Sequence, residues 1–167
     1  PLLARPEPAV GACDPAMPTV ISTSMTLDPG TYCGLELTSG ANVTLRDGVF
    51  VIKDNPLIVR DGAQLHGASA GFFFTGADAT FTFETGSTIS LSAPADGPMA
   101  GLLMFTSRSQ DPSLKYKILS DDARVMVGTI YVPQGELMID ASNPIADQSA
   151  YTAIVADKMR LYGGPHL

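Results

Sequence analysis

The chain has 167 residues, of which 45% are hydrophobic and 16% charged, and seventeen acidic against ten basic residues give a formal net charge of −7. This length is enough for one hydrophobic core, and no apolar stretch approaches the ~18 residues of a membrane span. The acidic balance leaves no basic stripe of the kind that phosphate backbones require. Nucleic acids and anionic membrane surfaces are therefore not expected partners.

The N-terminal residues have the composition of a linker. Five prolines occur among the first eighteen residues, at positions 1, 6, 8, 15 and 18, and few residues there favour strands. We expect residues 1–19 to be a proline-rich linker or N-terminal segment and residues 20–167 to be the folded domain. Because the chain begins at Pro1 rather than at methionine, we expect a processed protein or a part of a longer one, in which a missing signal or anchor is uninformative.

Three types of short strand then alternate in a fixed order. The first type follows a glycine and is apolar at nearly every position, as in 48–52, 71–74, 101–105, 128–132 and, more loosely, 151–155. The second type alternates between inward and outward positions in 35–37, 57–59, 81–83, 116–118 and 137–139. The third type alternates in the same way in 43–45, 64–66, 89–91, 125–127 and 159–161. Residues 30–32 resemble a shortened opening copy of the first type.

The spacing of these strands indicates stacked coils. The glycines that open the first type lie at 48, 71, 101 and 128 and are separated by 23, 30 and 27 residues, which fits a coil of three short strands and three turns. Each coil can bury its inner face only against its neighbours, so the coils must stack into a continuous core. The sequence predicts an all-β fold, a right-handed parallel β-helix (β-solenoid) of about five three-strand coils.

Alternation assigns residues to the inner and outer faces. The predicted inward residues are Leu37, Val43, Leu45, Val59, Phe81, Phe83, Ile89, Leu91, Val125, Val127 and Ile139. The predicted outward column of the second type is Glu36, Ile58, Thr82, Lys117 and Met138, and that of the third type is Thr44, His66, Ser90, Met126 and Arg160. The continuous apolar runs of the first type predict strands covered on both faces, without indicating what covers them.

Cys13 and Cys33 are the only cysteines. We predict a disulfide between them, because Cys13 lies in polar, proline-rich sequence where a buried thiol is implausible, and such a bond would favour an oxidising compartment. The alternative is two unpaired thiols in a cytosolic protein. Zinc ligation has no close cluster of cysteine and histidine in its favour.

Candidate catalytic and metal-binding residues are few. Asp121 and Asp122 form the one adjacent acidic pair, but neighbouring side chains on a strand point to opposite faces, so we interpret the pair as part of a solvated turn. His66 has no serine or cysteine neighbour that suggests a triad, and aspartates near glycines are interpreted as turn residues rather than calcium ligands. We therefore predict no catalytic, cofactor-binding or metal-binding residues, and no enzyme activity.

Five stretches carry a resemblance to a known family. They occur in the order 27–34, 41–54, 73–80, 128–133 and 151–157, the last reading Tyr-Thr-Ala-Ile-Val-Ala-Asp. Together they resemble the C-terminal region of TadG-like proteins of the bacterial tight-adherence (Flp) pilus machinery. The resemblance covers roughly residues 25 to 162.

The resemblance implies a membrane-anchored minor pilin or assembly component. Its C-terminal domain would lie outside the inner membrane, in the periplasm or at the cell surface, with envelope or pilus proteins as partners. The anchor of the family is absent from this chain, so membrane attachment would run through a segment that lies outside it. The resemblance implies no catalytic residues.

Three classes of function remain at this stage. The first is a non-catalytic structural, assembly or adhesion module of the pilus system, which the resemblance and the predicted disulfide favour. The second is an ice- or carbohydrate-binding solenoid, although neither outward column is a threonine or serine ladder. The third is a polysaccharide lyase or hydrolase, which would need clustered carboxylates and which fold analogy alone cannot establish. Function on a solenoid is expected in loops, here 93–100, 107–115 and 140–150.

Overall fold

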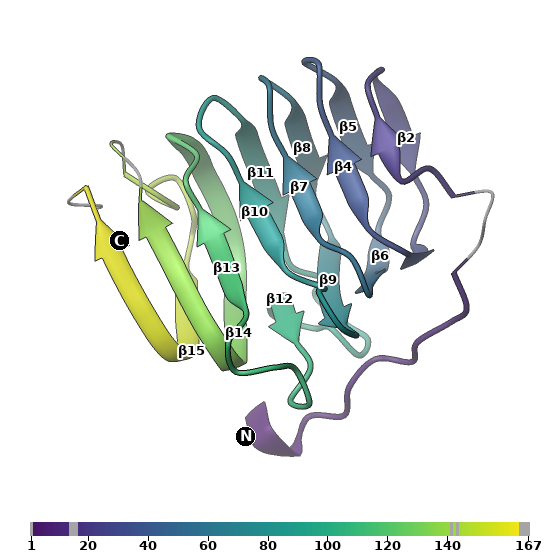
Figure 1. The fold of residues 1–167 in the computed structure, drawn as a ribbon, viewed down its shortest axis with the longest axis vertical. Helices are drawn as coiled ribbons and strands as arrows, with labels where there is room; N and C mark the ends of the chain where they lie inside the picture. Colours follow the sequence, from purple (N-terminus) through teal and green to yellow (C-terminus); the bar gives the residue numbers. More distant parts are fainter. Residues whose placement is uncertain (1, 14–16, 141, 143, 164–167) are drawn as a thin grey trace.

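The computed structural model describes residues 2–13, 17–140, 142 and 144–163; the remaining parts of the predicted linker, of the loop 140–150 and of the C-terminus lie outside the described residues. Parallel strands stack as a β-solenoid of about six turns, preceded by a short 3₁₀ turn η1 (Leu2–Ala4) (Figure 1). The predicted all-β solenoid is confirmed. It has one turn more than predicted, because two strands too short to show a period, at 20–21 and 25–27, complete an opening turn with residues 30–32.

The strands form three faces, which we name after the three strand types. The first face contains β3 (Gly30–Tyr32), β6 (Gly48–Lys53), β9 (Ala70–Thr75) and β12 (Leu102–Thr106). The second contains β1 (Val20–Ile21), β4 (Leu35–Leu37), β7 (Leu57–Val59), β10 (Phe81–Phe83) and β13 (Lys115–Ile118). The third contains β2 (Met25–Leu27), β5 (Asn42–Leu45), β8 (Gln64–Gly67) and β11 (Thr88–Ser92).

Two long strands continue around the corners of the solenoid. The strand β14 (Asp122–Asp140) pairs first on the third face, then on the first, then on the second. The strand β15 (Thr152–Tyr162) follows β14 along the first and second faces and ends the stack (Figure 1).

The predicted third-face strand at 159–161 is wrong. These residues belong to the second face, where Met159 lies opposite Leu137 of β14. The cause is the preceding loop, in which the Ala146 N–H donates to the Ala123 carbonyl at 2.9 Å. The loop occupies the third face in the last turn without forming a strand, so the chain reaches the next face one strand earlier than the order of types predicts.

The predicted inward positions of Val125 and Val127 are also wrong, as is the outward position of Met126. Met126 is fully buried, whereas both valines are half-buried on the outer side. The register between β11 and β14 shifts just before Ser90, which lies opposite Val125. A bulge of this kind adds one residue to a strand and inverts the parity of those that follow.

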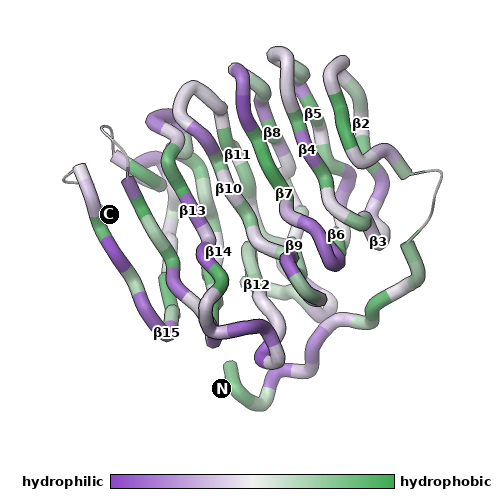
Figure 2. The backbone as a smooth tube through the Cα atoms, viewed as in Figure 1, coloured by the Kyte–Doolittle hydropathy of each residue, from purple (hydrophilic) through white to green (hydrophobic). Residues whose placement is uncertain are grey.

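The other predicted inward residues are confirmed, since each is at most 4% exposed; they are Leu37, Val43, Leu45, Val59, Phe81, Phe83, Ile89, Leu91 and Ile139. Figure 2 shows hydrophobic stretches that recur in every turn of the solenoid. Aromatic rings of successive turns also meet inside the core, with centroid distances of 6.0 Å between Tyr32 and Phe50 and 5.5 Å between Phe50 and Phe72. This repeated packing stabilises the stack in the way expected of aromatic pairs.

Stability should fall at high pH because of Tyr116. Burial raises the pKa of the Tyr116 hydroxyl to about 12, and the neighbouring Thr106 hydroxyl lowers it in part. The tyrosine of the unfolded chain ionises with its ordinary pKa of 10.0, so between these two values only the unfolded state loses the proton and the folded state is destabilised as the pH rises. We expect this residue to account for a loss of about 2 kcal/mol by a pH of about 11.5. Urea denaturation of the parent and of Tyr116→Phe at pH values below and above 10 measures this loss. The same pH dependence of the free energy of unfolding in both proteins would contradict it.

The outer side of the first face carries a second apolar cluster. Val51, Phe73, Phe105 and Tyr131 lie opposite one another in successive strands, and the rings of Phe73 and Phe105 lie 5.2 Å apart. All four side chains are at most 4% exposed. The prediction that this strand type is covered on both faces therefore holds.

The cover consists of a loop and the N-terminal segment (residues 2–13). Met99 of the loop 93–100 is part of the cluster, and Leu2 packs against it. The Arg5 guanidinium donates to the Ala100 carbonyl at 2.7 Å, which joins the two covering elements. Figure 1 shows the N-terminal segment running beside the first face from the early coils to the later ones.

Arg108 holds this cover in place. Its guanidinium lies over the ring of Phe105 at 5.0 Å and near that of Tyr131 at 5.7 Å. Its Nη2 atom donates to the carbonyls of Leu2 and Arg5, at 2.5 and 3.0 Å. The second residue of the predicted loop 107–115 thus binds the N-terminal segment to the aromatic surface.

We expect Arg108→Ala to loosen the N-terminal segment and to lower the free energy of unfolding by about 1 to 3 kcal/mol, because hydrogen bonds and a cation–π contact are lost together. The ion pair with Glu7, at 3.6 Å, is lost as well. Amide hydrogen exchange of residues 2–9 should accelerate. The matched control is Arg46→Ala, whose ion pair with Asp28 is 68% and 65% exposed and should contribute under about 0.5 kcal/mol. Unchanged exchange in the Arg108 variant would contradict the assignment.

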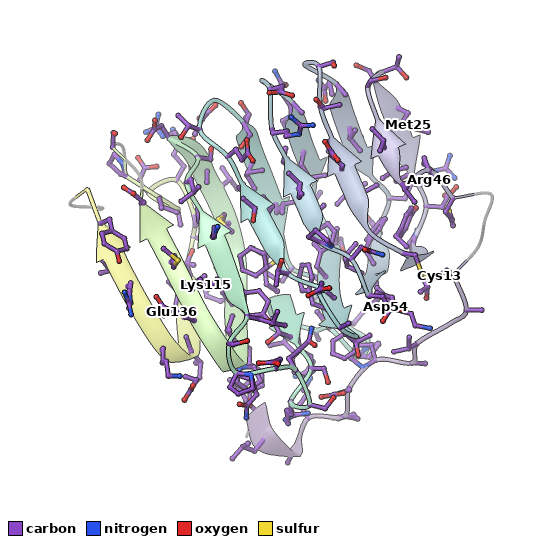
Figure 3. All side chains as sticks on the ribbon, viewed as in Figure 1. Cys13, Met25, Arg46, Asp54, Lys115 and Glu136 are labelled. Carbon is purple, nitrogen blue, oxygen red and sulfur yellow. A yellow bond between two sulfur atoms is a disulfide. The ribbon has the colours of Figure 1, made fainter. Side chains whose placement is uncertain are left out.

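A disulfide joins Cys13 and Cys33, whose Cα atoms are 5.6 Å apart (Figure 3). Cys33 follows β3 in the opening turn, so the bond attaches the end of the N-terminal segment to the first coil. The segment is therefore held at one end by this bond and at the other by Arg108.

Candidate functional site

An open pocket of about 550 Å³ lies at the corner between the second and third faces. It is lined by Thr85, Gly86, Thr88, Asp121, Asp122, Arg124 and Pro144. The turn after β10, the start of β11, the start of β14 and the loop 140–150 supply these residues. The pocket thus contains the acidic pair that the sequence analysis singled out.

Both carboxylates of the pair accept hydrogen bonds from neighbouring segments. Asp122 accepts from the Thr88 hydroxyl at 2.9 Å, and its own N–H donates to the Ser120 hydroxyl at 3.0 Å. Asp121 accepts from the Ser142 N–H at 2.6 Å. Asp121 lies in a turn, and Asp122 is the first residue of β14. The hydrogen bonds of the pair therefore stabilise the chain conformation at this corner.

Arg124 and Asp147 form a bidentate ion pair beside the aspartates. The Nε–Oδ1 and Nη2–Oδ2 distances are 3.0 and 2.6 Å. The hydrogen bond from Arg124 lowers the pKa of the Asp147 carboxyl, and the same contact raises the pKa of Arg124. The pocket therefore offers acceptors and donors to a polar ligand. Within the described ranges, no group of three or more His, Cys, Asp and Glu residues could hold a metal ion.

The predicted outward column of the second face, Glu36, Ile58, Thr82, Lys117 and Met138, is confirmed. It also contains Val20 at its start and Arg160 at its end, although the sequence predicted Arg160 on the third face. The outward column of the third face is Thr26, Thr44, His66, Ser90 and Val125. His66 lies 3.3 Å from Gln64 and is half-buried. Neither column is a regular ladder of one residue type.

The C-terminal end of the solenoid exposes apolar side chains. The exposed fraction is between 41% and 52% for Tyr151, Val155, Met159, Leu161 and Tyr162. Met159 and Leu161 continue the inward columns of Leu137 and Ile139, which are fully buried one turn earlier. A hollow of about 130 Å³ lies between the loop 140–150 and the start of β15 and is lined by Ile145, Ala146, Thr152 and Ile154.

Sequence reasoning did not identify this surface or the Arg108 contacts. Met159 and Leu161 follow the alternation of buried positions, and nothing in their local pattern distinguishes them from core residues. Arg108 lies in a polar loop, and no sequence signal connects it to residues about a hundred positions away. The acidic pair was found because two adjacent aspartates are visible in the sequence.

These features define a parallel β-solenoid with a polar corner pocket and an open, apolar C-terminal end. No family model, curated protein or solved structure matches this chain. In the part of the chain that the structure describes, no helix has the length and apolar character needed to cross a membrane. The resemblance to TadG-like proteins stays a prediction.

Proposed function

We propose that this chain is a non-catalytic structural or assembly module of a bacterial tight-adherence pilus system and that it acts through protein contacts. The observation that carries the proposal is the open end of the solenoid, where Met159 and Leu161 are 46% and 47% exposed. Large contiguous apolar patches on soluble proteins mark interaction sites. The order of sequence motifs described above supports the connection to the pilus system.

The disulfide supports an extracytoplasmic location. A bond between Cys13 and Cys33 is compatible with an oxidising compartment such as the periplasm or the cell surface. The N-terminal segment that it attaches covers the aromatic surface of the first face. The bond therefore helps to hold this cover over the first face.

Carbohydrate binding is the second candidate, and the corner pocket is the observation that favours it. Asp121, Asp122 and Arg124 present both acceptors and donors around an open hollow, which suits the hydroxyl groups of a sugar. Among the described residues that line the pocket there is no aromatic side chain on which a sugar ring could stack. The protein-contact function is therefore the better supported of the two.

Both candidates are tested with one set of variants. The tagged chain is incubated with purified prepilin and assembly proteins of a tight-adherence system, and in parallel with acidic and neutral polysaccharides with and without calcium. We expect at least one pilus protein to be retained, the retention to be lost with Leu161→Asp at the open end, and Thr82→Asp on the second face to behave like the parent. Retention of none would overturn the assignment to the pilus system. Sugar turnover that vanishes with Asp121→Asn or Asp122→Asn would overturn the non-catalytic assignment.

A further inference from the structure

The last strand has one paired edge and one open edge. The strand β15 pairs with β14 from Thr152 opposite Gly128 to Ala156 opposite Val132, and again, after a register shift at the corner, from Lys158 opposite Glu136 to Tyr162 opposite Asp140. Within the described residues no strand pairs with its other edge, as Figure 1 shows at the C-terminal end of the stack. An edge strand of this length presents a row of backbone donors and acceptors to a further strand.

The side chains at this end have the pattern of an inner coil. Ile154 continues the buried position of Ile130, and Ala156 continues that of Val132. Met159 and Leu161 extend the inward columns of the second face, as described above. A partner that buries this end must therefore supply apolar residues at matching inward positions on both faces.

The N-terminal end of the solenoid is better covered. Its inward residues Ile21, Leu27 and Tyr32 are only 1–3% exposed, and Met25, opposite Val43, is the exception at 40%. Met17 packs against the core at this end. Head-to-tail stacking of copies would have to displace this cover. Among the described residues nothing covers the C-terminal end, so a second copy that presents the same end displaces none of them and gives a closed, two-fold symmetric contact.

One antiparallel register of two β15 strands satisfies the inward positions. It places Ile154 of one copy opposite Leu161 of the other, and Ala156 opposite Met159, so that apolar inward residues meet apolar inward residues on both faces. The centre of this register falls between Asp157 and Lys158. Each Asp157 then lies opposite Lys158 of the other copy, which gives two pairs of opposite charge, favourable across neighbouring strands.

The adjacent registers are excluded by the same residues. A shift of one residue places either Asp157 opposite Asp157 or Lys158 opposite Lys158, and it also brings inward side chains opposite outward ones. Both residues are exposed, at 43% for the Asp157 side chain and 60% for that of Lys158. They lie where β15 passes from the first face to the second. A two-fold axis through this corner therefore stacks the first face of each copy on the second face of the other.

We propose that two copies of this chain associate end to end by antiparallel pairing of their β15 strands, with Asp157 of each copy opposite Lys158 of the other. The inference rests on the proposed function, because it names a second copy as the protein that covers the open end. The pairing extends the sheet of both copies and buries the apolar end of each core.

A charge-reversal cycle tests this proposal on the chain of 167 residues. Sedimentation velocity over a dilution series should show a dimer of the parent that dissociates on dilution. Asp157→Lys and Lys158→Asp should each raise the dimer Kd by about tenfold or more, because each places like charges together twice. The double variant Asp157→Lys/Lys158→Asp should recover the parent affinity. Asp96→Lys, which changes the net charge as Asp157→Lys does but in an exposed loop, should leave the dimer unchanged. Circular dichroism confirms that each variant is folded.

Every outcome of the cycle bears on the proposal. A parent that stays monomeric over the dilution series overturns it, and so does a dimer that ignores the single reversals or that the double variant fails to restore. A monomeric parent that binds a pilus protein through its open end overturns the inference and leaves the proposed function standing. A parent that dimerises but retains no pilus protein leaves the inference standing and overturns the assignment to the pilus system.

Discussion

Phe83→Ala should lower the free energy of unfolding by about 3 to 5 kcal/mol, whereas Thr82→Ala should change it by under about 0.5 kcal/mol. Phe83 is fully buried, and its ring lies 5.6 Å from that of Phe81 in the core. Its truncation removes apolar contacts and leaves a cavity that neighbouring coils cannot fill. Thr82 lies on the outer side of the same strand, opposite Ile58 and Lys117, where a shorter side chain leaves no cavity.

Urea denaturation of the two variants measures this difference, and unchanged m-values would show that the same surface is exposed on unfolding. The bulge in β14 provides a second comparison within the same experiment. Met126→Ala should cost about 2 to 5 kcal/mol, well above Val125→Ala. Equal losses for Phe83→Ala and Thr82→Ala would contradict the register of β10. Equal losses for the second pair would contradict the bulge alone.

The sequence predicted the solenoid because its repeated strands carry a clear local signal. Glycine followed by an apolar run marked the first face, and strict alternation marked the other two, so residues such as Leu37 and Phe81 could be assigned to the core. Side-chain parity in a strand is a local property. The same reasoning failed at Val125, Met126 and Val127, where three apolar residues in succession conceal the extra residue of the bulge.

The predicted order of the faces is wrong where a loop replaces a strand. The sequence presents 159–161 as another alternating strand, and only the hydrogen bonds between the loop 140–150 and β14 show that a third-face strand has been skipped. The cover of the first face was likewise beyond local reasoning. An apolar run such as 71–74 indicates that both sides are covered, but the covering residues lie far away in the chain, in the N-terminal segment and the loop 93–100.

The candidate sites also differ in whether a local sequence signal predicts them. The aspartate pair was visible as a dipeptide, whereas only the fold brings Asp147 to the pocket residue Arg124. The exposure of Met159 and Leu161 depends on the lack of a further coil against β15 among the described residues. Identical alternation in earlier strands produces buried side chains, so only the position of β15 in the stack makes this surface apparent.

Replacement of both cysteines, as Cys13→Ser/Cys33→Ser, should lower the free energy of unfolding by roughly 3 kcal/mol. The bond closes a loop across a sequence separation of 20 residues and thereby restricts the unfolded chain. The fold itself should persist, because the inward columns of the solenoid do not depend on the bond and Arg108 still holds the start of the N-terminal segment. Reduction of the parent should reproduce the loss, and the double variant should be insensitive to reductant.

Thiol titration under denaturing, non-reducing conditions provides the direct measurement. The bonded protein should show no free thiol, and two free thiols per chain would contradict both the bond and the extracytoplasmic location that it supports. Amide exchange distinguishes the two attachments of the N-terminal segment. Loss of the disulfide should accelerate exchange most in the part nearest Cys13, whereas Arg108→Ala should do so in residues 2–9. This separation follows because the two contacts hold opposite ends of one segment over the aromatic surface of the first face.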